Sequence, residues 1–146
     1  MADDPLDFGV DFEEVTARLE AMAYFLSVTD ILDATEALDD TVPAAPPAAF
    51  VGTARERAEP NRLIGGHAQR VPIGIAILFV ESAARMDGRT KFQMEATKRA
   101  IIRQLVAWQP RGALSGLEYD GYRVVSIGNG LAWGEVTFAT SYRLHT

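Results

Sequence analysis

The chain contains no cysteine among its 146 residues, which excludes disulfide bonds, thiolate metal sites and cysteine nucleophiles. It has only two histidines, His67 and His145, so one chain cannot form an all-histidine zinc site. Long apolar runs are also missing, since the longest, Val71 to Val80, is half of the ~20 residues that a membrane-spanning helix needs. The N-terminus is acidic and lacks the form of a signal peptide. We therefore expect a soluble, intracellular protein that needs no cofactor.

The sequence also lacks the motifs of common nucleotide-binding and hydrolytic enzymes. It has no P-loop, no HExxH zinc motif and no GxSxG nucleophile elbow. Gly128-Asn129-Gly130 begins like a dinucleotide fingerprint, but the third glycine is missing and an expected strand follows instead of a helix. The sequence therefore gives no positive sign of catalysis.

The net charge of −6 is unevenly distributed along the chain. Residues 1–40 carry twelve acids and one base, a balance of −11, whereas residues 41–146 carry eight acids and thirteen bases, a balance of +5. This pattern fits either a solvated acidic helix and tail, or a molecule whose two ends meet different neighbours. The bases are scattered and aromatic residues do not alternate with them, so a nucleic-acid-binding patch is not indicated.

Two segments have the periodicity and the end signals of helices. A capping box at Asp11 predicts a helix from Phe12 to Met22. A second capping box, at Thr90 and Gln93, predicts a longer helix from Lys91 to Trp108. The apolar stripe of this longer helix consists of Met94, Ile101, Leu105 and Trp108.

Alternating or continuous apolar residues predict the strands. The expected strands are Tyr24 to Ile31, Ala48 to Arg57, Val71 to Glu81, Leu117 to Tyr119, Gly121 to Ile127 and Leu131 to Leu144. The last two form a hairpin around the turn at 128–130. The remaining segments are expected to be helical turns at 33–38, a proline-rich connector at 41–47, a loop at 58–70 and a turn at 85–89.

Alternation also assigns the faces of the strands. In the strand at 48–57, one face carries Phe50, Gly52 and Ala54, and the other carries Val51, Thr53, Arg55 and Arg57. The strand at 71–81 is apolar on both faces, so we expect both sides of the sheet to be covered. Its small residues Gly74 and Ala76 lie either under a second subunit or under a loop of the same chain. Trp108 and Trp133 are expected in the core or as interface anchors.

The order of elements places consecutive strands next to one another, which favours an antiparallel sheet. We predict an α+β fold in which two main helices pack on one face of an antiparallel sheet, as a two-layer sandwich. Residues 1–146 are expected to form one domain, with residues 1–10 as an acidic N-terminal arm.

The loop at 58–70 is the best candidate for a binding or catalytic site, although its composition also fits a loop without such a role. The segment Leu63-Ile64-Gly65-Gly66-His67 has the composition of a backbone nest that binds an anion. His67 is a candidate base there, with Glu56 or Glu59 as its acidic partner. The alternative is a flexible loop whose glycines allow positive φ and whose histidine is exposed. We favour this alternative, because no carboxylate stands at a recognisable spacing.

One series of short motifs resembles a known family. It consists of Glu56 to Leu63 (ERAEPNRL), Gln69-Arg70, Trp108-Gln109-Pro110, Leu117-Glu118-Tyr119, Leu131-Ala132-Trp133 and Phe138 to Tyr142. Their order and spacing resemble the small tail-terminator proteins of tailed bacteriophages and prophages, in the Mu-like tail-terminator group. The resemblance covers about residues 12–145.

The resemblance implies a structural role within a virion assembled in the bacterial host cytoplasm. Such proteins form a ring, commonly a hexamer, that docks on the last ring of tail tube protein and stops its polymerisation. The ring then offers a docking surface to the head-tail connector, or neck, and DNA passes through its lumen without specific binding. The resemblance implies no enzymatic activity, no cofactor, no metal and no membrane.

For a ring of this kind, we expect nine residues at the protein interface: Arg55, Arg57, Arg62, His67, Gln69, Arg70, Gly74, Ala76 and Trp133. The arginines of the loop have acidic counterparts in Asp3, Asp4, Asp7 and Asp11, which suggests a head-to-tail contact between copies. Three other functions stay open at this point. They are a neck adaptor of the same particle, a small monomeric binding module, and a small enzyme that uses His67.

Overall fold

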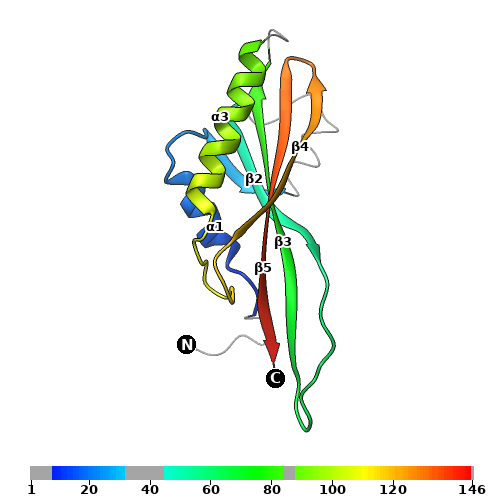
Figure 1. Ribbon diagram of the computed structural model, residues 1–146. Coiled ribbons are helices and arrows are strands. Elements are labelled where there is room, and N and C mark those ends of the chain that lie inside the picture. The colour runs from blue at the N-terminus through cyan, green and yellow to red at the C-terminus, as the bar shows by residue number, and fades with distance from the viewer. Residues whose placement is uncertain (1–7, 32–44, 84–87, 146) are drawn as a thin grey trace.

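The computed structural model describes residues 8–31, 45–83 and 88–145 (Figure 1). This part of the chain forms two helices and five strands. Their bounds are α1 Phe12–Glu20, β1 Ser27–Asp30, β2 Ala48–Glu56, β3 Ala68–Ser82, α3 Gly88–Leu105, β4 Glu118–Gly128 and β5 Leu131–His145. The helical turns predicted at 33–38, most of the connector at 41–47 and most of the turn at 85–89 lie outside the described residues.

The five strands form one mixed sheet in the order β1-β2-β3-β5-β4. The pairs β2–β3, β3–β5 and β4–β5 are antiparallel, as the order of elements predicted. The prediction of a wholly antiparallel sheet is wrong at one edge, where β1 pairs parallel with the first residues of β2. The direction of a strand pair depends on the path of the connection between the strands, and alternation within each strand does not report that path.

The other edge of the sheet is one continuous strand, β4, where two short strands were predicted. Its register with β5 shifts between Tyr119 and Gly121, and again between Val124 and Ser126. The predicted break near Asp120 is therefore a bulge, in which one extra residue interrupts the alternation without ending the strand. The hairpin turn between β4 and β5 lies where it was predicted, with positive φ at Asn129 and Gly130.

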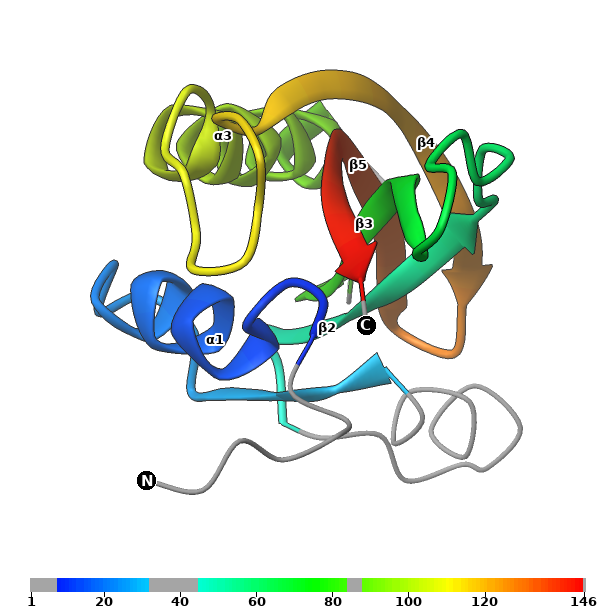
Figure 2. The same ribbon diagram turned by 90° about the horizontal axis from the view of Figure 1, so that it is seen from below.

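Both helices pack against the same face of the sheet, as predicted (Figure 2). Asp11 caps α1, and its carboxylate accepts the N–H of Glu14 at 3.2 Å. The bond that Asp11 contributes to the first predicted capping box is therefore confirmed. The buried side chains that join the helices to the sheet include Val15, Leu19, Ile75, Ile77, Phe79, Met94, Ile101, Leu105, Val136 and Phe138. The main core therefore lies between the two helices and the face of β3 that carries Ile75, Ile77 and Phe79.

The ends of α3 differ from the prediction. The helix begins before Thr90, so Thr90 lies in its first turn and the predicted capping box at Thr90 and Gln93 is wrong. The helix ends at Leu105, short of the predicted end. It stops there because Ala107 takes a φ of +66° and donates its N–H to the carbonyl of Leu117. A long-range bond thus replaces the next helical hydrogen bond.

A bulge in β2 reverses the faces that alternation predicted for its last residues. Thr53 pairs with Ile75, but the next registered pair is Arg55 with Gly74. Because the bulge adds one residue, Arg55 lies on the face away from the helices, together with Gly74. The Arg55 side chain covers this glycine, since a Cβ added at Gly74 would lie 3.2 Å from Arg55 Cγ. The predicted assignment of Arg55 to the face of Val51 is therefore wrong.

The face of the sheet away from the helices has its own apolar cluster. Its buried members are Ala48, Phe50, Leu78, Val80 and Trp133, and partly buried Ile31, Val125 and Leu131 pack against them. The Trp133 ring stacks on Phe50 with 5.7 Å between the ring centroids. Ala76 on the same face is only 1% exposed. The apolar cluster on this face is thus buried within one chain.

At one end of the molecule, β3 and β5 continue beyond the helices (Figure 1). With the connection from β2 to β3, these strand ends form an extension that we call the arm, residues 57–72 and 141–145. Backbone bonds continue the pairing after β2 ends, from Arg57 N to Pro72 O at 3.2 Å and from Glu59 N to Arg70 O at 2.9 Å. The arm is therefore an ordered ribbon that carries the loop at its far end.

Candidate functional site

The loop at the end of the arm is organised by one side chain, Asn61. Its Oδ1 accepts the N–H of Leu63 at 3.2 Å and the N–H of Ala68 at 2.9 Å, and its amide donates to the carbonyl of Gly66 at 3.1 Å. Gly65 supplies a φ of +78°, which glycine adopts without strain. The N–H of Leu63, which the predicted nest at 63–67 would aim at an anion, is therefore already bonded, and the anion-binding hypothesis loses support.

Residues 62–64, which lead into the turn of this loop, combine one charge with two large aliphatic side chains. We call Arg62, Leu63 and Ile64 the tip. Ile64 is 99% exposed and Leu63 is 53% exposed. Burying an isoleucine or leucine side chain stabilises a protein by about 1.5–3 kcal/mol, and the tip forgoes this within the chain. Exposed aliphatic side chains at the end of an ordered extension are typical of a contact surface.

Three arginines of the arm, Arg57, Arg62 and Arg70, and Arg55 of the neighbouring strand β2 differ in their partners. Arg70 Nη1 pairs with Glu59 Oε1 at 2.7 Å, and Arg55 Nη2 lies 3.7 Å from Asp120 Oδ2. The side chains of Arg57 and Arg62 form no ion pair with any described residue. Such exposed pairs contribute only about 0–1 kcal/mol each, so Arg70 and Arg55 can exchange partners at little cost. The arm therefore presents positive charge to whatever approaches it.

The structure does not support a catalytic His67. Its Nε2 lies 2.5 Å from Gln69 Oε1, and the Gln69 amide donates to the carbonyl of Glu59 at 2.9 Å. The two proposed acidic partners are engaged elsewhere, because Glu56 accepts a hydrogen bond from the Tyr142 hydroxyl and Glu59 pairs with Arg70. Among the described residues, no carboxylate therefore orients the imidazole in the way a general base requires.

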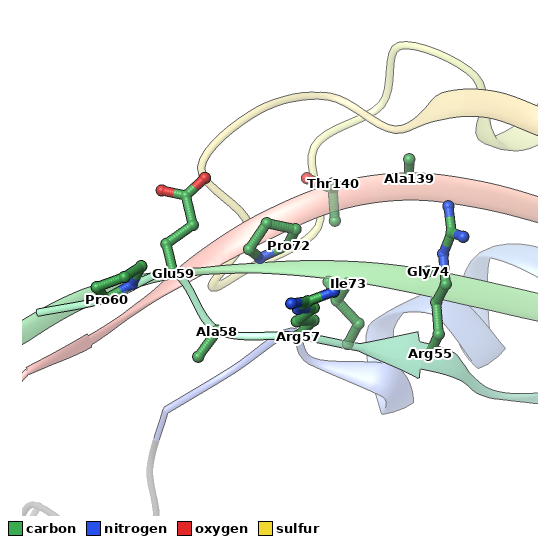
Figure 3. Close-up of a pocket in the computed structure, with 10 residues that line it drawn as sticks. All are labelled: Arg55, Arg57, Ala58, Glu59, Pro60, Pro72, Ile73, Gly74, Ala139 and Thr140. Carbon is green, nitrogen blue, oxygen red and sulfur yellow. The ribbon is translucent and has the colours of Figure 1, made fainter.

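A shallow groove of about 550 Å³ lies at the base of the arm (Figure 3). Arg55 and Arg57 line it from β2 and the segment that follows, beside Pro72 and Gly74 of β3, and Ala139 lines it from β5. The small residues of β3 and β5 leave this space, and Arg55 and Arg57 outweigh the one carboxylate in its lining, that of Glu59, which pairs with Arg70. The groove suits an acidic or carboxylate-bearing protein segment more than an apolar ligand.

The predicted interface residues fall into two groups in space. The groove or the arm carries Arg55, Arg57, Arg62, His67, Gln69, Arg70 and Gly74. Ala76 and Trp133 lie instead on the face away from the helices, where they are 1% and 4% exposed. A partner cannot touch these two buried side chains directly, so their place at an interface stays a proposal that their burial does not favour.

Sequence reasoning missed two buried hydrogen-bond networks, one at each end of β3. At the root of the arm, the buried Tyr142 hydroxyl donates to Glu56. Burial and then this hydrogen bond raise the pKa of Tyr142 to about 12. At the opposite end of β3, the 4% exposed Glu81 accepts hydrogen bonds from Tyr24 and Thr97 at 2.6 Å each. Burial and then the Glu81 hydrogen bond raise the pKa of Tyr24.

The exposed tip also escaped prediction, but unlike these two networks it had a signal in the sequence. Leu63 and Ile64 are two adjacent large apolar residues inside a polar, glycine-rich segment, where nothing local would bury them. Glu81 is 57 positions from its partner Tyr24, and Tyr142 is 86 positions from its partner Glu56, and no local pattern connects residues so far apart.

No described helix is long and apolar enough to cross a membrane. Within residues 8–31, 45–83 and 88–145, the structure also contains no group of three or more His, Asp and Glu side chains arranged to hold a metal ion.

Comparison with known proteins adds a family and a related fold. The phage tail terminator protein family matches the chain over residues 1–146. No curated protein matches it. Among solved structures, a chain from the virion of a native gene transfer agent (GTA) particle has a similar fold. The TM-score is 0.60 over 93% of this chain and 96% of that chain, and at 16% sequence identity the likeness shows the fold alone. Because the family matches the whole chain, this protein belongs to the phage tail terminator family, a family of structural proteins.

Proposed function

We propose that this protein forms a hexameric ring that caps the head-proximal end of a phage-type tail tube. The ring stops the growth of the tube and then offers its outer surface to the head-tail connector. The observation that carries the proposal, beside the family, is the arm with its exposed tip. A subunit that must contact both a neighbour and a tube needs an ordered extension of this kind, which a self-contained monomeric module does not.

The groove and the arm are the surfaces that we assign to these contacts. Arg55, Arg57, Arg62 and Arg70 attract carboxylates of an adjacent protein, and the tip supplies apolar area. The N-terminal acids Asp3, Asp4 and Asp7 are candidate partners for the arginines of the next copy. Asp11 is removed from this set, because it caps α1 and lies 4.0 Å from Arg111.

We propose a location in the virion, at the junction of tail and neck, after assembly in the bacterial host cytoplasm. DNA passes through the lumen of the ring without specific binding, and we propose no catalytic step and no cofactor. The net charge of −6 is consistent with passage of DNA, since a negative surface does not retain phosphates.

The test is the growth of tail tubes in the presence of the purified full chain. Tube protein is allowed to polymerise alone and with the chain, and tube lengths are measured by negative-stain electron microscopy. We expect shorter tubes with a ring at one end only. Binding to isolated portal complexes without any effect on tubes would support a neck adaptor instead. A monomer that ignores both partners would overturn the proposal in favour of a binding module.

A further inference from the structure

The tip of the arm has no partner within the described part of its own chain. Arg62 makes no hydrogen bond or ion pair there, and Ile64 is 99% exposed. The hydrogen bonds of Asn61 hold the loop in one conformation, so little conformational entropy is lost when the tip becomes buried. The tip is thus a preorganised contact that combines apolar side chains with one positive charge.

A groove of matching character lies elsewhere on the molecule, between α1 and the β1 edge of the sheet. Its volume is about 380 Å³. Phe12 and the buried Val51 supply its apolar part, and Glu13, Glu20 and Asp30 supply negative charge around it. A groove of this size is near the lower end of ligand pockets, which span about 300–1,000 Å³, so it suits a few side chains.

Two of the carboxylates at this groove, those of Glu13 and Glu20, are available to a partner. Neither Glu13 nor Glu20 forms an ion pair with any described residue. The groove at the base of the arm is a poorer match for the tip, because its two arginines would repel Arg62. The sign of the charge therefore favours the groove beside α1.

The tip and the α1 groove lie on opposite sides of one chain. The loop of the arm is at the lower right of Figure 1 and α1 at the left, and the view in Figure 2 also separates them. A contact between them must therefore join two copies. It uses a different surface on each copy, and such heterologous contacts generate rings when the rotation between subunits closes.

We infer that the tip of one copy, Arg62 to Ile64, inserts into the groove between α1 and β1 of the next copy. Leu63 and Ile64 pack against Phe12, and the Arg62 guanidinium pairs with Glu13 and Glu20. This inference rests on the proposed ring and deepens it, because it names the two surfaces that build the ring.

The absence of cysteine makes this contact directly testable by disulfide cross-linking. The double variant I64C/T16C places one thiol on the tip and one in the groove, at Thr16. Disulfides form only when the two Cα atoms come within about 4.4–6.8 Å. On mild oxidation of the assembled oligomer, we expect a ladder of covalent species up to the full ring. The matched control is I64C/R103C, which puts the second thiol on the exposed side of α3 and gives no ladder.

A charge variant gives an independent readout of the same contact. Arg62→Glu in the I64C/T16C background is expected to lower the cross-linked fraction by about fivefold, the upper range for one exposed ion pair. Glu20→Arg added to it restores part of the yield, because the signs are exchanged.

The outcomes separate the contact from the proposed function. A ring-sized mass with no ladder, or equal ladders for both cysteine pairs, overturns the contact while tube capping stands. A product that stops at covalent dimers also overturns it, because a head-to-tail contact continues around the ring. A wild-type chain that does not cap tubes would overturn the proposed function itself. The tube assay detects this outcome before any cross-linking is done.

Discussion

Gly134→Ala is the substitution whose effect the structure determines most closely. Gly134 lies in β5 on the face that meets α3. A Cβ added there would lie 2.8 Å from Phe79 Cζ, 2.9 Å from Phe79 Cε1 and 3.1 Å from Met94 Cε. Phe79 is fully buried and Met94 is 5% exposed, so neither can move aside into solvent. We expect the variant to lose about 1–3 kcal/mol of the free energy of unfolding, as overpacked cores do.

The sign of this change is informative, because replacing glycine by alanine at a compatible position normally stabilises a protein by about 0.4–1 kcal/mol. Gly121→Ala is the matched control in the neighbouring strand, where the nearest atom to an added Cβ is Thr137 Oγ1 at 3.7 Å. We expect this control to change stability by less than about 1 kcal/mol. Urea unfolding followed by tryptophan fluorescence measures both variants.

A double-mutant cycle tests whether contact with Phe79 causes the loss of stability in Gly134→Ala. Phe79→Leu removes the end of the ring that the new methyl group would meet, so the combined variant should cost less than the two single costs together. We expect a coupling energy of about 0.5–3 kcal/mol. Strict additivity, or a Gly134→Ala variant as stable as the wild type, would refute the reasoning.

Three further results are expected. Between about pH 10 and pH 12 the unfolded chain loses its tyrosine protons while Tyr142, with its pKa raised to about 12, keeps its own. Stability should therefore fall as pH rises, and Tyr142→Phe should make this fall shallower in unfolding at several pH values. Glu81→Gln replaces one buried acceptor by a donor that faces Tyr24 and Thr97. It should lower the free energy of unfolding by about 1–3 kcal/mol, which is measured as a lower thermal midpoint. Ile64→Asp should leave stability within about 0.5 kcal/mol of the wild type, because the side chain is 99% exposed, yet abolish tube capping in electron micrographs.

Features with a local cause were predictable from the sequence. The cap at Asp11 and the start of α1 follow from a side chain that bonds three residues ahead. The buried stripe of α3 and the two apolar faces of β3 follow from the periods of helix and strand. The positive φ values at 129–130 follow from the turn residues Asn and Gly. Each of these depends on residues within one or two turns of the chain.

The errors lie where distant segments decide the local structure. The parallel direction of β1 depends on the connection to β2, and the end of α3 depends on a bond from Ala107 to Leu117. The bulge before Arg55 reverses a face that strict alternation had assigned. No local pattern specifies any of these three features.

The candidate site divides in the same way. The sequence by itself determined which residues carry positive charge and which loop joins the strands, and its order of motifs led to the terminator family. Only the tertiary structure decided that the arm projects beyond the helices, that Leu63 and Ile64 lie exposed at its tip, and that Ala76 and Trp133 are buried. The reason is physical: exposure depends on what the rest of the chain covers, and that is set by packing between segments far apart in sequence.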